Sequence, residues 1–256
     1  MRKFIRILVV IVLCLVLIGI WAPDWLRFGG YRYKHASRYT AGGTALHQKV
    51  ENLDISWISG KVKIERHKGD EIILSETCDE RLKEAEEVHW LVEDDTLYVK
   101  FVRSGKRYSS KLNKNITLKL PEKMNLENVL ISTVSAGVEA DLPKAERVEM
   151  NGVSGGVDVT LEKADTVKLS TVSGDALLSF AAAPRRIDAN GVSASLTVEL
   201  PENTGFTADL DSVSGHISGK LLDGLNSTKA YTRGDGDCTI HMDTVSGNLR
   251  LDAYDR

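Results

Sequence analysis

Hydrophobic and polar residues alternate with a period of two through most of the chain after residue 125, and the alternation changes phase at regular intervals. In one such unit Val167, Leu169 and Thr171 precede the change, and Ala176 and Leu178 follow it. A period of two is typical of a strand with one buried face. The sequence therefore predicts pairs of strands joined at a corner, with the apolar sides of both strands facing one shared interior.

A short tripeptide, Val-Ser-Gly or Val-Ser-Ala, stands at each change of phase. Serine and glycine suit a turn, and a period near twenty residues indicates one supersecondary unit repeated along the chain. The copies begin at positions 134, 153, 172, 192, 213 and 245, so the steps between them are 19, 19, 20, 21 and 32 residues. They are Val134-Ser135-Ala136, Val153-Ser154-Gly155, Val172-Ser173-Gly174, Val192-Ser193-Ala194, Val213-Ser214-Gly215 and Val245-Ser246-Gly247.

One unit of this size buries too little apolar surface to offset the entropy of ordering its backbone, so neighbouring units must stack and share a core. The fold class we predict is all-β, a β-solenoid-like stack of about twenty-residue strand-turn-strand repeats. A β-sandwich of ordinary hairpins is the alternative. The β-repeat domain is expected to span 45–256, with a less regular first part at 45–124 and regular repeats at 125–256.

The less regular first part contains degenerate copies of the same unit. Ile58-Ser59-Gly60 resembles the tripeptide, and Leu120-Pro121 resembles the Leu-Pro ending of the regular copies. The charged stretch 79–89 predicts a short helix that packs Leu82, Ala85 and Val88 on one side. Such a helix would cover one end of the stack, where an open sheet edge invites aggregation.

The last step is the longest, and it includes Leu221 to Cys238. We expect these residues to add one hairpin and the last unit to form the end of the stack. Asp252, Asp255 and Arg256 would then be the charges that protect this edge from pairing with another sheet, and the edge is also a candidate contact surface.

The N-terminus carries an apolar run from Phe4 to Ala22 in which Arg6 is the one charged residue. Nineteen helical residues reach about 28 Å, which is enough to cross a bilayer. We therefore expect 1–26 to form a cytoplasmic tip and one N-terminal transmembrane helix, with a cleaved signal peptide as the alternative. Residues 27–44 are basic and rich in glycine. They predict a stalk, with contact to anionic lipid or an acidic wall polymer as the alternative.

Basic residues flank both sides of this span, so the positive-inside rule does not decide its orientation. A very short segment before a single anchor usually stays in the cytoplasm. The expected location is therefore the cell membrane, single-pass, with the β domain extracellular. The membrane is then one partner, and a wall polymer or another envelope protein is a possible second.

The formal net charge of −3 gives no support for nucleic-acid binding. Two cysteines lie outside the apolar run, Cys78 and Cys238. Sequence cannot show whether they pair, and we favour two free thiols because 160 residues separate them.

No pattern of catalytic or ligand-binding residues stands out. The repeated serines lack a nucleophile elbow, and the six histidines lack metal-ligand spacing, so no catalytic, cofactor-binding or metal site is expected. His216 and His241 are expected to face solvent. Two weaker candidates remain: a carboxylate row for Ca²⁺ or sugar chemistry, and the adhesion-type tripeptide Arg233-Gly234-Asp235. The row would contain Asp158, Asp175, Asp209 and Asp211.

The recurring Leu-Pro and Thr-Val-Ser-Gly-Asp pattern behind one membrane anchor resembles the bacterial putative-adhesin β-repeat family, a domain of unknown function. The resemblance covers about residues 45–256 and depends on 170–175, 211–215, 244–248 and 198–201. It implies stacked-strand envelope proteins, some of them associated with envelope stress in Gram-positive bacteria, and it carries over no catalytic or ligand residue. Ala136 and Ala194 depart from the family's usual glycine, which puts tight turns there in doubt.

The function expected from these features is a membrane-anchored extracytoplasmic scaffold without catalysis, either an adhesin or an envelope-associated binding protein. An accessory sensor or regulator of an envelope-stress response is the first alternative. A polysaccharide-acting β-solenoid enzyme is the second.

Overall fold

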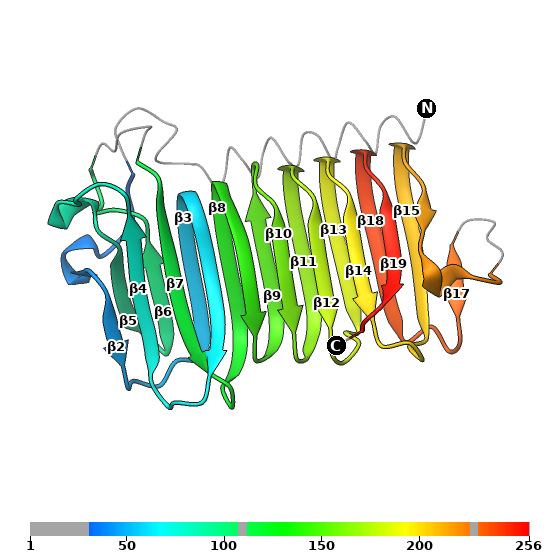
Figure 1. The fold of residues 1–256 in the computed structure, drawn as a ribbon, viewed down its shortest axis with the longest axis horizontal. Coiled ribbons are helices and arrows are strands. Elements are labelled where there is room, and N and C mark those ends of the chain that lie inside the picture. The colour runs from blue at the N-terminus through cyan, green and yellow to red at the C-terminus, as the bar shows by residue number, and fades with distance from the viewer. Residues whose placement is uncertain (1–30, 107–111, 226–229, 256) are drawn as a thin grey trace.

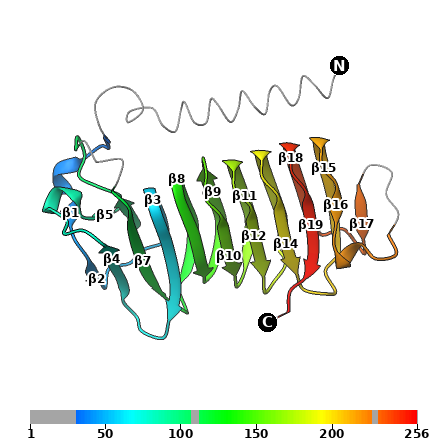
Figure 2. The same cartoon turned by 45° about the horizontal axis from the view of Figure 1, so that its top comes forward.

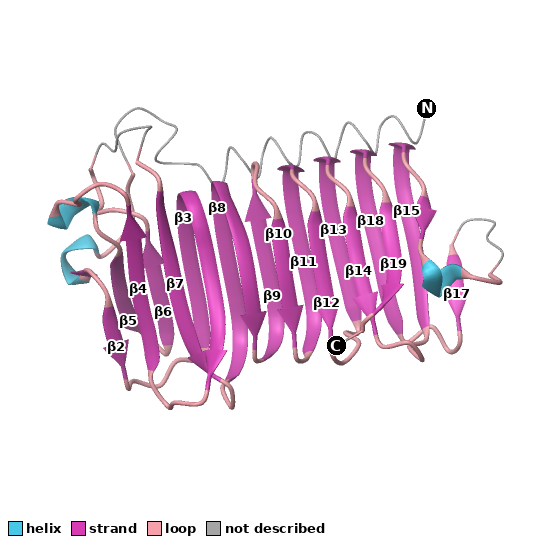
Figure 3. Cartoon of the chain, in the orientation of Figure 1, coloured by secondary structure: helices cyan, strands magenta, loops and turns pink. Residues whose placement is uncertain are grey.

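A computed structural model of the chain describes residues 31–106, 112–225 and 230–255 (Figure 1). Regular structure in these ranges is almost entirely β-strand, with three short 3-10 helices (Figure 3). The strands of the first part are β1 (Thr40–Ala41), β2 (Thr44–Leu46), β3 (Asn52–His67), β4 (Ile72–Cys78), β5 (His89–Glu93), β6 (Thr96–Lys100) and β7 (Lys114–Pro121). The strands of the repeat region are β8 (Asn125–Leu142), β9 (Lys144–Gly152), β10 (Val157–Leu161), β11 (Ala164–Ser173), β12 (Ala176–Phe180), β13 (Arg186–Ser193), β14 (Leu196–Leu200), β15 (Phe206–Ser214), β16 (Ile217–Ser218), β17 (Tyr231–Arg233), β18 (Cys238–Ser246) and β19 (Leu249–Ala253). The helices are η1 (Ala36–Arg38), η2 (Glu84–Glu86) and η3 (Lys220–Leu222).

The strands form one sheet that is folded over into two walls. The first wall runs in the order β5, β6, first half of β3, first half of β8, β9, β11, β13, β18, β15 and β17. The second wall runs in the order β2, β4, β7, second half of β3, second half of β8, β10, β12, β14, β19 and β16. We call one strand of each wall, or one bent strand that serves both, a layer.

Neighbouring layers pair in parallel from β6 and β7 to β15 and β16. The register matches the sequence repeat, because Leu169 of β11 lies opposite Met150 of β9 and Ala189 of β13. Parallel pairing of successive copies is the pattern of a solenoid, whereas the hairpins of a β-sandwich would pair antiparallel. The predicted solenoid-like all-β fold is therefore confirmed.

The apolar sides of the two walls meet in a single interior. Leu169 and Leu178 are 3% and 0% exposed, and Val198 and Leu249 are both 0% exposed. These four residues come from both walls and from three copies, so they test the predicted change of phase directly. The corner keeps the hydrophobic side of each strand inside, as the sequence pattern predicts.

Tight approach between layers explains the glycine in several tripeptides. Gly174 has a φ of +108°, and a Cβ atom there would lie 2.4 Å from the carbonyl oxygen of Gly155 in the preceding layer. The corner nevertheless tolerates alanine, because Ala136 and Ala194 are buried and take other backbone conformations. β8 runs through its corner at Ala136 as one bent strand, so the missing glycine does not interrupt the fold there.

The last copy does not form the end of the stack, contrary to our expectation. β18 pairs with β13 on one side and with β15 on the other, and β19 lies between β14 and β16 in the same way (Figure 2). Along the 32-residue step the chain first forms the end layer, β15 and β16, and then returns to form β18 and β19 between that layer and the layer of β13 and β14. Within it, η3 packs the buried Leu221, and β17 pairs antiparallel with β15 at Phe206–Ala208. One added strand with a helical turn thus replaces the predicted hairpin.

At the N-terminal end of the stack the chain likewise forms outer strands and then returns to an internal layer. β3 is paired with β8, while the chain between them forms an outer layer of β6 and β7 and, beyond it, the antiparallel strands β4 and β5. The degenerate copies predicted around Ile58-Ser59-Gly60 and Leu120-Pro121 are therefore two separate layers of the stack. The first and the last copies in the sequence are therefore both internal layers of the stack, with another layer on each side.

The helix predicted at 79–89 is wrong. The structure has only the one-turn η2 at Glu84–Glu86, and Val88 and His89 are already buried at the start of strand β5. A helix of this length is marginal without packing along one face. Burial of Val88 and His89 in the sheet removes that packing and ends the helical turn.

The predicted membrane span at 4–22 lies outside the described residues. Within residues 31–255, apart from the two internal gaps, no helix is long and apolar enough to cross a membrane. The described part of the predicted stalk differs from a free linker. β1 pairs with β5, β2 pairs with β4, and Tyr31 is only 6% exposed, because its ring packs in the core.

Candidate binding site on the corner edge

The serines of the tripeptides line the corner edge of the stack. In the N-terminal copies each hydroxyl donates a hydrogen bond to a carbonyl of the preceding layer. Ser135 Oγ donates to Ile58 O at 3.1 Å, and Ser154 Oγ donates to Val134 O at 3.3 Å. Ser173 continues the series with a bond to the carbonyl oxygen of Val153. The recurring serine therefore ties each layer to the one before it.

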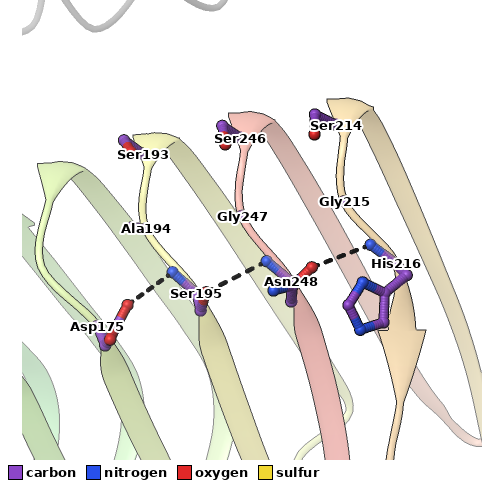
Figure 4. A pocket seen from close by; sticks show the side chains of 10 residues that line it. All are labelled: Asp175, Ser193, Ala194, Ser195, Ser214, Gly215, His216, Ser246, Gly247 and Asn248. Carbon is purple, nitrogen blue, oxygen red and sulfur yellow. Dashed lines mark hydrogen bonds between the residues drawn. The ribbon is translucent and has the colours of Figure 1, made fainter.

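The same position behaves differently in the C-terminal copies. Among the described residues, the hydroxyls of Ser193, Ser214 and Ser246 have no hydrogen-bond partner, and all three side chains are exposed. Figure 4 shows them in a row along the top of the corner. Thr244 Oγ1 donates to Val192 O at 3.4 Å, which is the carbonyl that the repeat pattern would offer to Ser246. Sequence alone does not separate these three serines from the bonded ones.

A second row lies one residue beyond each tripeptide. Asp175 Oδ1 accepts a hydrogen bond from Ser195 N at 3.1 Å, and Ser195 Oγ accepts one from Asn248 N at 3.3 Å. Asn248 Oδ1 in turn accepts from His216 N at 3.2 Å (Figure 4). Side chains thus join four successive layers, and they hold the row in register.

The two rows border a shallow depression with a volume of about 430 Å³. Its lining contains hydroxyl, amide, carboxylate and imidazole groups and two glycines. The lining residues are Asp175, Ser193, Ala194, Ser195, Ser214, Gly215, His216, Ser246, Gly247 and Asn248. Such a surface offers many hydrogen bonds and few charges, so it suits an uncharged polar ligand better than an ionic or apolar one.

The depression contains a serine, a histidine and an aspartate but not the geometry of nucleophilic catalysis. An activated serine needs a hydrogen bond to a base that a third group orients. Of the ten residues in Figure 4, none donates a serine hydroxyl to the His216 ring, and Asp175 is bonded to Ser195 instead. No group of three or more metal-ligating side chains occurs in the part of the chain that the structure describes.

The predicted carboxylate row does not form. Asp158 is on the outer side of β10 in the second wall, Asp175 is at the corner, and Asp209 and Asp211 are on β15 in the first wall. Because these positions belong to different faces, the four carboxylates cannot act together on one ligand.

His241 lies in a compact charged cluster on the first wall. Its Nδ1 lies 2.5 Å from Asp209 Oδ2 and its Nε2 lies 3.1 Å from Asp243 Oδ2, while Asp188 is its register partner on β13. Burial opposes protonation of the ring, but the two carboxylates outweigh burial and raise the pKa of His241 above its ordinary value. Both histidines face outward as expected: His241 lies on the outer side of β18, where its neighbours bury it in part, and His216 is exposed.

Cys78 and Cys238 are free and lie far apart. Six layers separate the layer of β4 from that of β18, which corresponds to about 33 Å at ordinary strand spacing. A disulfide requires Cα atoms within about 7 Å, so one molecule cannot form this bond. Burial also raises the pKa of the Cys238 thiol to about 12.

The tripeptide Arg233-Gly234-Asp235 lies at the turn between β17 and β18. Gly234 and Asp235 are exposed, but Arg233 is partly buried and belongs to the paired strand β17. The arginine and the aspartate are therefore not displayed together on a free loop.

Comparisons with known proteins give one family match and distantly similar solved structures. No curated protein matches the sequence. A solved structure described as a putative cell adhesion protein from Clostridium sporogenes ATCC 15579 is 15% identical, covers 83% of this chain and 99% of its own, and has a TM-score of 0.47. A putative adhesin from Bacteroides fragilis NCTC 9343 is 13% identical, covers 82% of this chain and 95% of its own, and has a TM-score of 0.40.

The model of one protein family matches residues 47–252, which include every strand from β3 to β18 and most of β19. This range agrees with the extent of the predicted resemblance to the putative-adhesin β-repeat family, which is confirmed. The chain belongs to the Toastrack DUF4097 family.

Proposed function

We propose that the protein is a non-catalytic binding scaffold of the cell envelope, with an adhesin-like role. In this proposal residues 4–22 anchor the chain in the membrane and the solenoid lies outside the cell. The depression on the corner edge binds an extended, hydroxyl-rich polymer such as a wall polysaccharide. The observation that carries the proposal is the row of three unpartnered serine hydroxyls at the depression.

The spacing of the row favours an extended polymer over a compact ligand. Ser193, Ser246 and Ser214 lie on adjacent layers, and layers of a sheet are about 4.8 Å apart. Three equivalent hydroxyls at a constant interval can bond to groups that repeat along a chain. Because the labelled side chains follow the corner across adjacent layers, such a chain can lie along them.

Hydroxyls that are solvated in the free protein lose little when they exchange water for a ligand. The net contribution of a typical hydrogen bond is about 0.5–1.5 kcal/mol. Three such bonds give modest affinity for one short segment. Longer polymers and several copies of the protein on one surface would raise the effective affinity through multivalency.

The test is binding of the full-length protein, held in detergent or in nanodiscs, to purified wall polysaccharide. We expect the double variant Ser193→Ala/Ser246→Ala to bind about ten-fold more weakly. The matched control is Ser135→Ala/Ser154→Ala, which removes two serines of the same motif whose hydroxyls are already bonded within the protein. Equal binding by all three proteins would overturn the proposed site.

Release of sugar fragments during the same incubation would overturn the non-catalytic part of the proposal. Orientation has its own test, in which protease is added to intact cells. We expect digestion of the β domain without lysis. Digestion only after lysis would place the domain inside the cell and remove the envelope ligand.

A further inference from the structure

Two segments meet at the corner edge where the described chain begins. The carbonyl oxygen of Tyr31 accepts a hydrogen bond from Gly105 N at 2.5 Å, and Tyr33 N donates to Ser104 Oγ at 3.1 Å. Tyr31 also donates its hydroxyl to Ser56 O at 3.3 Å. These bonds hold residues 31–33 beside residues 103–105, at the corner of the β6 and β7 layer.

Three cations of these segments are exposed and have no carboxylate partner among the described residues. They are Arg32, Lys34 and Arg103, and we call them the basic collar. Burial raises the pKa of the Tyr33 hydroxyl to about 12, and the charge of the nearby Arg103 opposes that rise. Unpaired cations on two bonded segments add their positive potentials in one small area.

Three other cations close to the collar are paired with carboxylates. Arg38 forms an ion pair with Glu93, and His35 Nδ1 lies 3.2 Å from the same carboxylate. Lys106 Nζ lies 3.4 Å from Glu86 Oε1. These three side chains are paired within the protein, whereas the collar itself is open to an external anion.

The length of chain between the predicted span and Tyr31 limits the distance between the collar and the membrane. Residues 23–30 separate the predicted span from Tyr31, and eight residues reach at most about 28 Å when fully extended. The corner edge at Tyr31 must therefore stay near the bilayer surface whenever residues 4–22 are inserted.

We propose that the basic collar binds the headgroups of anionic phospholipids in the membrane that holds the anchor. This inference rests on the membrane anchorage proposed above. Each cation near an anionic surface strengthens association by about five-fold, so three give about a hundred-fold preference for the docked position. Docking at this corner fixes the N-terminal end of the stack on the membrane.

The depression does not overlap the collar. Its layers, from β12 to β16, lie four to seven layers from the layer of β6 and β7, which is about 20–35 Å. The collar and the depression are therefore separate surfaces of the same edge, one for lipid and one for polymer.

Lys34 provides a native probe for the test. The full-length chain is inserted into nanodiscs of phosphatidylcholine alone, or with about one third phosphatidylglycerol, and its lysines are acetylated briefly and mapped by mass spectrometry. We expect the acetylation of Lys34 to slow at least five-fold in the anionic discs. Lys68, Lys123 and Lys163 are exposed on the opposite edge, and their rates are expected to stay the same.

A pair of variants then tests the cause. Arg32→Gln/Arg103→Gln is expected to bring the Lys34 rate in anionic discs back to its value in phosphatidylcholine, and Lys68→Gln/Lys123→Gln is expected to leave it slow. Equal Lys34 rates in both discs, or equal slowing on both edges, would overturn docking by the collar while anchorage stands. A chain that the discs do not retain would overturn the anchorage and the collar together.

Discussion

The ammonium group of Lys114 lies 2.8 Å from Glu76 Oε2 inside the N-terminal end of the stack, where the Lys114 side chain is 0% exposed. The same ammonium group donates to Glu86 O at 2.6 Å and lies 5.0 Å from the centre of the Trp57 ring. Desolvation lowers the pKa of Lys114, and the Glu76 carboxylate opposes that effect. A charge at this depth is tolerated only because its partner, a carbonyl and an aromatic ring replace water.

Removal of one partner of this pair should destabilise the fold strongly. Glu76→Ala leaves the buried ammonium group without its counter-charge, and it also leaves Val88 N without its acceptor. We expect a loss of about 3–5 kcal/mol in the free energy of unfolding, measured by urea denaturation. Lys63→Ala breaks an exposed ion pair with Glu65 and should leave the unfolding midpoint unchanged. Similar losses in both variants would contradict this account of the buried pair.

The contact between His241 and Asp209 should make stability depend on pH. A raised pKa means that the folded state binds the proton more tightly than the unfolded chain, so protonation stabilises the fold. This contribution is complete below the ordinary histidine pKa of about 6.5, and it is lost as pH rises through the raised pKa.

The measurement is the free energy of unfolding from pH 6 upward for the unmodified protein and for His241→Gln. The advantage of the unmodified protein should shrink as pH rises, because β18 loses a charged contact to β15. His216→Gln is the control, since the His216 ring is exposed and has no carboxylate contact among the described residues. A difference between the two proteins that stays constant with pH would count against the contact.

Gly174 should be far less replaceable than a glycine with the same sign of φ in open space. Gly174→Ala places a Cβ atom 2.4 Å from the backbone carbonyl of Gly155 in the preceding layer, in addition to the cost of a positive φ. Gly224 has a φ of +78° and nothing within 4 Å of the added atom. We expect a loss of about 1 kcal/mol for Gly224→Ala and of at least about 3 kcal/mol for Gly174→Ala, measured by thermal and urea unfolding.

The bonded and the unpartnered serines should differ in stability as well as in binding. Ser154→Ala removes a hydrogen bond between layers and is expected to cost about 0.5–1 kcal/mol, because the Val134 carbonyl keeps its bond from Ser154 N. Ser193→Ala removes no bond within the protein and should cost close to nothing. The free energy of unfolding decides between them, and a similar loss in both would mean that the Ser193 hydroxyl has an internal partner in solution.

The alternation of residues was sufficient to predict the walls, the interior and the corner, because a phase change admits few arrangements that bury every apolar position. It could not predict that Val245-Ser246-Gly247 lies between the copies at Val192 and Val213. All copies present similar edges to their neighbours, so either order satisfies the local pattern. Nor could it identify Ser193 and Ser246 as unpartnered, since that depends on Thr244 and on the layer order. The helix at 79–89 failed because the burial of Val88, directly before strand β5, outweighed local helix propensity.

Because the last copy lies between two other layers, the layers at this end of the stack should unfold cooperatively. β15 and β16 have parallel partners only in β18 and β19 among the described strands, so they depend on the last copy for their attachment to the rest. A chain that stops after Asp237 should therefore lose the β15 and β16 layer as well as β18 and β19, and its new end should be β13 and β14.

Hydrogen exchange followed by mass spectrometry measures this loss. We expect fast exchange throughout Phe206–Ser214 and retained protection in Ala164–Ser173. Met242→Ala, in the core of β18, should raise exchange in β15 and β18 together in the full chain. Slow exchange in Phe206–Ser214 of the shortened chain would show that β15 can instead pair directly with β13, as the order of the copies in the sequence would suggest.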